Sequence, residues 1–118
     1  MKADVTDEAD VQRLVDEVIR TRGRIDALIN LVGGFAMGRV VETDAALWQR
    51  MLTMNVTAAF LLSKAVLPHM VARGTGRIVH VAAWAAVEPF PGAAAYIVSK
   101  ASLLALIKVL ALELSGSG

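Results

Sequence analysis

Residues 25–34 read IDALINLVGG, a short and mostly apolar run that ends in the pair Gly33 and Gly34. The segments before and after it carry helical patterns. A continuous apolar run of this length between two helices is typical of a strand buried in a parallel sheet. Residues 25–32 therefore predict a strand, and the chain is expected to have an α/β fold.

Two long helices are expected on either side of this strand. Residues 7–22 have one apolar stripe at helical period, which Thr6 can cap and Gly23 can end. Residues 44–72 form a longer helical stretch that Pro68 interrupts late. The strand at 25–32 would thus be joined to its neighbours through helices.

The rest of the chain holds a second strand and a third helix. Residues 77–83, RIVHVAA, predict the strand. Residues 94–114 predict a helix whose second half is apolar almost all round, so we expect other elements to cover it on more than one side. The order helix, strand, helix, strand, helix indicates parallel strands with crossover helices. Two strands make a marginal sheet, so the chain reads as the middle of a larger fold.

Composition excludes several classes of protein. A chain of 118 residues suits one domain, and with 56% hydrophobic and 19% charged residues it is too apolar for a disordered segment. The net charge of +1 gives no reason to expect nucleic-acid binding. The acidic N-terminus is not a signal peptide, and the uncharged stretches fall short of the roughly 18 residues of a membrane helix. We therefore expect neither a nucleic acid nor a membrane as a partner.

Cysteine and histidine usage bears on metals and on the compartment. The chain has no cysteine, which excludes a disulfide framework and a thiolate zinc site and fits a reducing, cytoplasmic compartment. His69 and His80 lie on different predicted elements without partner spacing. No metal site is expected.

Tyr96 and Lys100 stand four residues apart, which places both side chains on one face of a helix. A lysine cation near a phenol favours the phenolate, so the pair suits proton transfer at neutral pH. The spacing also occurs by chance in many helices. A proton-transfer role for the pair is favoured by the strand at 77–83, because ligands bind at the carboxyl ends of strands in parallel α/β folds.

Two further residues stand out in this context. Gly33 follows the strand at 25–32, where the backbone can approach a ligand closely. Asn55 lies in the middle of a long apolar helix, where an asparagine costs free energy if it is buried unpaired. Either Asn55 has a chemical role, or it only satisfies a neighbouring carbonyl.

Five segments resemble the short-chain dehydrogenase/reductase family, in the family's order and spacing and across nearly the whole chain. They are ADVTD at 3–7, INLVGG at 29–34, MNVTAAF at 54–60, GRIVHVAAW at 76–84 and YIVSKASLLAL at 96–106. Each segment is a weak signal alone, and five in register are a strong one. The resemblance implies a single partial Rossmann-like domain over residues 1–118, doubly wound and with three α/β/α layers when complete.

The resemblance also implies an activity, the transfer of a hydride between NAD or NADP and a small alcohol or carbonyl substrate. Tyr96 would donate or accept the substrate's proton. Lys100 would favour the Tyr96 phenolate and bind the nicotinamide ribose, and Asn55 would hold a water that relays protons from Lys100 to solvent. By resemblance, the cofactor-binding residues are Asp4 and Val5 near the adenine, Asn30, Gly33, Tyr96 and Lys100.

The family's catalytic serine position falls on Ala83, so the sequence lacks the hydroxyl that would orient and polarise the substrate oxygen. Losing one such donor costs on the order of a hundredfold in rate. His80 is a poor substitute, because strand alternation points it to the opposite face from residue 83. Trp84 could offer its indole N–H, although an aromatic ring that packs in a pocket is the commoner role.

No G-x-G-x-x-G turn occurs in the 118 residues, and GGFAMG at 33–38 has the wrong spacing for one. The family's first strand, its glycine-rich turn and the strands after residue 118 are expected to be missing. NLVG also replaces the family's N-N-A-G segment at 30–33. We therefore expect the isolated chain to bind dinucleotide weakly or not at all, to be weak or inactive as a catalyst, and to self-associate through exposed apolar surface.

A different class of function stays open. The helices at 44–72 and 94–114 could pair with copies of themselves, as these helices do in the family, and make a non-catalytic dimerisation or scaffold module. Ala83 fits such a module, whereas Tyr96, Lys100 and Asn55 fit an enzyme. Under either reading, a homo-oligomer through these two helices is expected.

Overall fold

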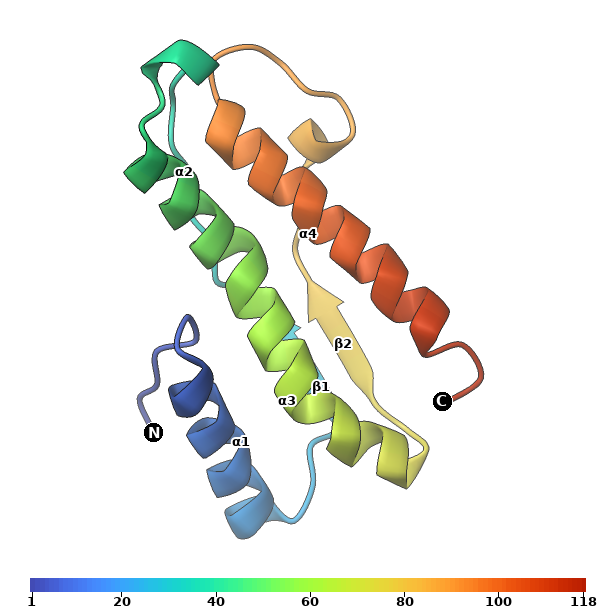
Figure 1. Cartoon of the computed structure of the whole chain (residues 1–118). Helices are drawn as coiled ribbons and strands as arrows, with labels where there is room; N and C mark the ends of the chain where they lie inside the picture. The colour runs from blue at the N-terminus through green and yellow to red at the C-terminus, as the bar shows by residue number, and fades with distance from the viewer.

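The fold consists of a two-stranded parallel sheet and the helices that cover it, in a computed structural model that describes all 118 residues (Figure 1). The helices are α1 (Glu8–Arg22), α2 (Ala45–Leu52), α3 (Ala58–Arg73) and α4 (Ala94–Glu113), and the strands are β1 (Ala27–Asn30) and β2 (Arg77–His80). A π-helical turn (Thr53–Thr57) joins α2 to α3, and short 3₁₀ turns lie at Val40–Glu42 and Trp84–Ala86. The predicted α/β order is confirmed.

The two strands pair in parallel, with Ala27 opposite Arg77 and Asn30 opposite His80. Both strands are shorter than the predicted ranges 25–32 and 77–83. Beyond His80 the backbone bonds to a side chain instead of to β1: the Val81 carbonyl accepts a hydrogen bond from the Lys100 side chain. The segments after both strands therefore act as loops at the carboxyl edge of the sheet.

The ends of the helices follow local chemistry, with one correction. Asp44 caps α2 by accepting a hydrogen bond from the Leu47 N–H, and Gly23 ends α1 in the left-handed conformation. Thr6 was expected to cap α1, but Asp7 holds the N-cap position. The Thr6 hydroxyl instead donates to the Asp4 carboxylate, because that carboxylate also accepts the Thr6 N–H and closes a local turn.

Pro68 does not interrupt the long helix, contrary to the sequence-based expectation, because α3 runs through it to Arg73. The helical run from Ala45 to Arg73 is 29 residues long and α4 has 20, so by length and composition both could cross a membrane. Both helices pack against other elements of the fold, and half of the most apolar window of the first is buried. Core helices of water-soluble proteins meet the same criteria.

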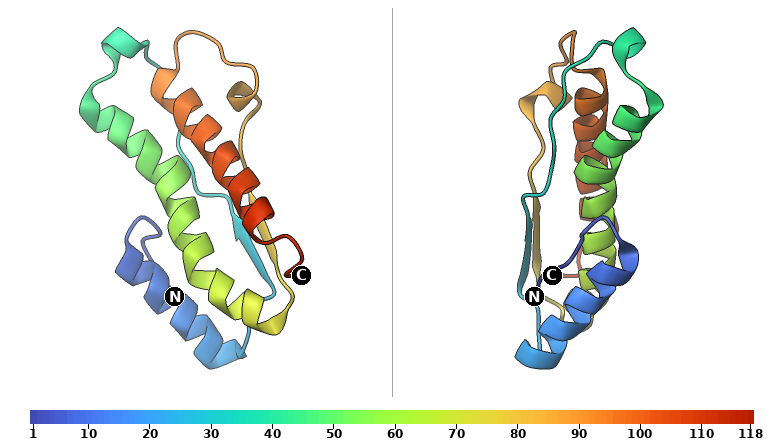
Figure 2. Two further views of the ribbon diagram at one scale, coloured as in Figure 1. Left: turned by 45° about the vertical axis from the view of Figure 1, so that its right-hand side comes forward. Right: turned by 90° about the vertical axis from the view of Figure 1, so that its left-hand side faces the viewer.

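All of the long helices lie on one face of the sheet, as the edge-on view of Figure 2 shows. The molecule is only 16 Å thick along its shortest axis, which corresponds to two layers rather than three. The main core lies between α1 and α3 and above the strands. Its buried residues are Val11, Val15, Leu61, Leu62, Ala65, Val66 and Met70.

Two apolar surfaces remain uncovered. The sheet face opposite the helices presents Ile29 and Val79, both largely exposed to solvent. The second half of α4 was expected to be covered on more than one side, yet Val109 and Leu112 are exposed, Leu112 by 79%. A third layer is absent here, so these surfaces have nothing in the chain to pack against.

Candidate functional site

The candidate site lies where the carboxyl ends of β1 and β2 meet the start of α4. In Figure 1 the loop after β1, the turn at Trp84–Ala86 and the first residues of α4 lie at the same end of the molecule. This arrangement follows from the parallel strands, which deliver both of their following loops to one edge of the sheet. Tyr96, Lys100, Asn55, Gly33 and Ala83 all belong to these segments or face them.

Asn55 is the most completely hydrogen-bonded residue of the site. Its Oδ1 accepts the Gly34 N–H at 2.8 Å, and its Nδ2 donates to the Gly34 carbonyl at 3.0 Å and to the Ser99 hydroxyl at 2.8 Å. The side chain is only 1% exposed. It projects from the π-helical turn Thr53–Thr57, an irregularity that often marks functional positions in helices. Asn55 thus joins the loop after β1 to α4.

Lys100 is a buried cation in the same region. Its Nζ donates to the Val81 carbonyl at 3.0 Å, and the residue is 8% exposed. Burial lowers the pKa of Lys100 below its ordinary value of 10.5, because the charged form loses solvation. A methyl group built on Gly33 would lie 3.4 Å from this Nζ and 2.8 Å from the Asn55 Oδ1. Gly33 therefore lies against both side chains, where a residue with a side chain would crowd the Asn55 oxygen.

Tyr96 lies one helical turn before Lys100 and is partly buried. Its ring packs edge-to-face on Phe35, with centroids 4.7 Å apart and planes at 71°. Tyr96 also packs on the small cluster that includes Ala85 and Ile97, so the turn at Trp84–Ala86 lies against it. The loops after both strands therefore contact the Tyr96 ring.

Ala83 ends the β2 segment in an extended conformation and precedes the 3₁₀ turn at Trp84–Ala86. Trp84 does not substitute for the missing hydroxyl, because its Nε1–H donates to the Glu88 carboxylate at 3.1 Å and its side chain is exposed rather than packed in a pocket. The His80 ring contacts Ser63 in the helical layer and Asn30 at the end of β1. The site thus contains no hydroxyl donor at the position of Ala83.

Three of the residues expected to bind cofactor have contacts elsewhere. Asp4 accepts hydrogen bonds from Thr6, and these lower the pKa of its carboxyl. Val5 packs against the core between α1 and α3. The Asn30 side chain is buried between His80 and its own following turn. The contacts of Asp4, Val5 and Asn30 are thus local or within the core, whereas Gly33, Asn55 and Lys100 lie together one helical turn from Tyr96.

Sequence reasoning missed two groups that complete the site. Ser99 is fully buried and links the Asn55 amide to the Tyr96 carbonyl, to which its hydroxyl donates at 2.7 Å. A serine inside an otherwise apolar helix was the available signal for it. The Val81 carbonyl that holds Lys100 had no such signal, because a backbone group is present at every residue.

Comparison with known proteins agrees with this geometry. The family model described as short chain dehydrogenase matches residues 1–118, the whole chain. The chain belongs to the short-chain dehydrogenase family. Among curated members, 2-(R)-hydroxypropyl-CoM dehydrogenase of Xanthobacter autotrophicus is 37% identical over 100% of this chain and 48% of its own length.

Solved short-chain dehydrogenase structures share the fold. NAD+-bound xylitol dehydrogenase has a TM-score of 0.93 and 40% identity, covering 98% of this chain and 45% of that one. ElxO with NADP bound has a TM-score of 0.96 and 28% identity, covering 100% of this chain and 48% of that one. The chain therefore has the Rossmann-like α/β fold of the family, and it spans about half the length of the relatives that it matches.

Titratable residues do not form a metal centre in this short-chain dehydrogenase chain. No group of three or more His, Cys, Asp or Glu side chains lies close enough to hold a metal ion. His69 and His80 lie on α3 and β2.

Proposed function

We propose that the chain provides the proton-transfer half of an NAD(P)-dependent oxidoreductase acting on a small alcohol or carbonyl compound. The observation that carries this proposal is the convergence of Lys100, Asn55 and Gly33 next to Tyr96 at the carboxyl edge of the sheet. A buried cation that is held one turn from a phenol, where a glycine backbone lets a ligand come close, suits proton transfer.

Each residue has a role in this proposal. The Tyr96 hydroxyl gives its proton to the substrate oxygen in reduction and takes it back in oxidation. Lys100 stabilises the phenolate form through its positive charge and can donate to a ribose hydroxyl. Asn55 fixes the loop at Gly33 and Gly34. Both protons of its amide are donated and its Oδ1 already accepts the Gly34 N–H, so the second lone pair of that oxygen is the position left for a relay water. A nicotinamide ring bound here would supply the hydride.

The residues present fit the nicotinamide end of such a cofactor. Gly33 leaves the approach between Asn55 and Lys100 free of side chain. The 118 residues contain no G-x-G-x-x-G turn for the pyrophosphate, so we propose weak binding by this chain alone. With Ala83 in place of a hydroxyl donor, we also propose a low rate, smaller by on the order of a hundredfold than with a serine.

The surroundings of Tyr96 favour an apolar substrate. Phe35, Trp84 and Phe90 are exposed aromatic side chains on the two loops at this edge, and Glu88 is tied to the Trp84 indole. The side chains named here are thus mainly apolar. A small apolar alcohol or ketone fits best.

The test is a fluorescence titration of the chain with NADH and with NADPH, compared with two variants. Lys100→Met keeps an apolar stem of similar length but removes the buried charge. Lys64→Met removes an exposed lysine that pairs with Glu8 on the helical side. We expect weak binding that Lys100→Met reduces at least tenfold and Lys64→Met leaves unchanged. Equal binding by the parent chain and Lys100→Met would contradict the proposal.

A second candidate function, a self-associating scaffold, is favoured by the exposed apolar residues on α3 and α4. Phe60 and Val71 on α3 and Val98 and Leu112 on α4 are between two-fifths and four-fifths exposed. We propose that copies of the chain pair through this layer. Light scattering of Phe60→Lys and Val98→Lys should show a shift toward monomer, whereas Val79→Lys on the opposite sheet face should not. A shift toward monomer in Val79→Lys alone would show that the chains associate through the sheet face instead.

A further inference from the structure

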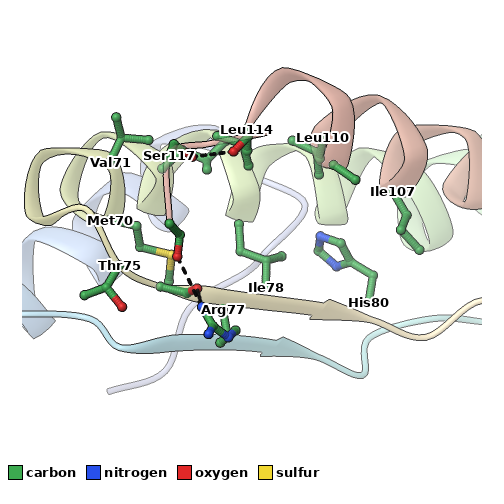
Figure 3. A pocket seen from close by; sticks show the side chains of 14 residues that line it. Met70, Val71, Thr75, Arg77, Ile78, His80, Ile107, Leu110, Leu114 and Ser117 are labelled. Atoms are coloured by element: carbon green, nitrogen blue, oxygen red, sulfur yellow. Dashed lines mark hydrogen bonds between the residues drawn. The ribbon is translucent and has the colours of Figure 1, made fainter.

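His80 has no part in the proposed chemistry, yet both of its ring nitrogens are engaged. Its Nδ1 lies 3.2 Å from the Asn30 Nδ2, and its Nε2 lies 2.8 Å from the Ser63 Oγ. Figure 3 shows the ring rising from β2 into the helical layer, beside Ile78 and facing Ile107. The imidazole thus connects the last residue of β1 with α3.

The protonation state of this ring follows from the Val32 backbone N–H, which is connected to it through two hydrogen bonds. The Val32 N–H can only donate, and it donates to the Asn30 Oδ1 at 3.0 Å. The Asn30 amide is therefore oriented with its oxygen toward Val32 and its NH₂ toward His80. Because an NH₂ group also only donates, the His80 Nδ1 must accept. The ring is then neutral with its proton on Nε2, which donates to Ser63.

We infer that His80 is a positioning residue: as the neutral Nε2–H tautomer it ties Ser63 of α3 to Asn30, and so it sets the turn from Asn30 to Val32 that leads into Gly33 and Gly34. The next residues of that loop are held by Asn55. His80 therefore fixes one end of the loop that faces Lys100, and Asn55 fixes the other. The consequence for cofactor binding rests on the function proposed above, but the tautomer and the turn do not.

Protonation of His80 would break this arrangement. A second N–H at Nδ1 would face the Asn30 NH₂, so the amide would have to rotate and give up the Val32 N–H. Burial acts in the same direction, because it lowers the pKa of His80 below its ordinary value of 6.5. The stabilisation is thus fully present above pH 6.5 and is lost as the pH falls through the lower pKa of the folded state.

No neighbouring charge changes this assignment, because burial is the only cause that acts on the pKa of His80. The charged groups on the elements packed around it have other partners: Lys64 bonds to Glu8, Arg73 to Asp26, Arg77 to Gly76 and Gly118, and Lys100 to Val81. His69 and Lys108, on α3 and α4, appear in no ion pair.

The first test is a long-range ¹H–¹⁵N NMR spectrum of the isotope-labelled chain over a pH series. His69 is the only other histidine, so its ring signals are told apart from those of His80 with a His69→Gln variant. We expect the His80 Nδ1 at the shift of an unprotonated ring nitrogen, a midpoint below the ordinary histidine value of 6.5, and Val32, Gly33 and Gly34 amide shifts that follow His80. An Nδ1–H tautomer, or a Val32 amide that ignores the His80 titration, would overturn the inference.

The second test separates positioning from simple packing. His80→Gln can present an oxygen to Asn30 and an NH₂ to Ser63, whereas His80→Leu fills the space without either bond. We expect the Val32 amide shift to stay near the parent value in His80→Gln and to move toward its random-coil value in His80→Leu. If His80→Leu folds and its Val32 shift is unchanged, the inference is overturned. If His80→Leu does not fold, a random-coil Val32 shift in His80→Gln overturns the inference instead. Neither test uses a cofactor, so failure of the proposed function leaves both readouts intact.

Discussion

Asn55 binds both backbone groups of Gly34, accepting its N–H at 2.8 Å and donating to its carbonyl at 3.0 Å. The loop after β1 is thus held by hydrogen bonds to one buried side chain rather than by pairing with a neighbouring strand. The π-helical turn that carries Asn55 interrupts the regular helix between α2 and α3. The residue that holds the loop beside Lys100 therefore comes from an irregular turn of the helix.

Asn55→Ala should lower the free energy of unfolding by about 3 kcal/mol, because it leaves both backbone groups of Gly34 without their partner and removes the hydrogen bond to the buried Ser99 hydroxyl. Thr57→Ala, in the same turn but outside this network, should change stability by less than about 0.5 kcal/mol. Urea unfolding monitored by circular dichroism measures both. Similar losses in the two variants would show that the turn, and not the hydrogen bonds, limits stability.

Gly33→Ala should destabilise the chain by about 1–3 kcal/mol, because the added methyl group would lie 2.8 Å from an Asn55 oxygen that cannot move freely. Gly34→Ala is the matched comparison. There the close atoms belong to the flexible side chains of Met51 and Met54, which can shift. Denaturation midpoints should therefore fall further for Gly33→Ala than for Gly34→Ala, and the opposite order would contradict the described packing.

Ala83→Ser should raise the rate of alcohol oxidation or ketone reduction with NAD(P) by on the order of a hundredfold, since it adds a donor for the substrate oxygen. The residue already has the extended conformation of an N-cap, where a serine is favoured, so stability should not fall. Steady-state rates and melting temperatures measured together separate the two effects. Loss of the added rate in the double variant Ala83→Ser, Tyr96→Phe would confirm that the increase in rate requires the Tyr96 hydroxyl.

Raising the pH should stabilise the chain through Lys100. Burial lowers the folded-state pKa of Lys100, so the unfolded chain binds more protons between that pKa and the ordinary value of 10.5. Stability from this group therefore rises with pH across that window and is fully present above it. Lys100→Met should lose this rise in urea midpoints, whereas Lys64→Met should keep it. A parallel pH dependence in all three chains would place Lys100 in a solvated position instead.

Much of the fold was predictable because hydrophobic periodicity reports burial directly. The helices at 7–22 and 94–114 and the parallel pairing of the two strands were found in this way. The strand ends were not, because Val81 gives its carbonyl to a side chain 19 residues later. The helix over 44–72 was predicted, but the expected interruption at Pro68 was wrong, since packing against the sheet outweighs one lost hydrogen bond.

The site was only partly predictable from sequence. Tyr96, Lys100, Asn55 and Gly33 were identified from the sequence; the last three lie together in the structure, one helical turn from Tyr96. The tautomer of His80 could not have been found, because it depends on Asn30 and Ser63, which lie far from it in sequence. Periodicity shows which face a side chain occupies but not which atom it meets.

The measurement that tests the central claim most directly is an NMR titration of the labelled chain with NADH at millimolar concentration. We expect weak, fast-exchange shifts at the amides of Gly33, Gly34, Ala83 and Tyr96, which Lys100→Met abolishes. An apolar groove between α3 and α4, lined by residues that include Met70, Ile78 and Leu110, provides the alternative location. Shifts confined to that groove, or none up to the solubility limit of NADH, would contradict a nicotinamide site at Tyr96 and Lys100.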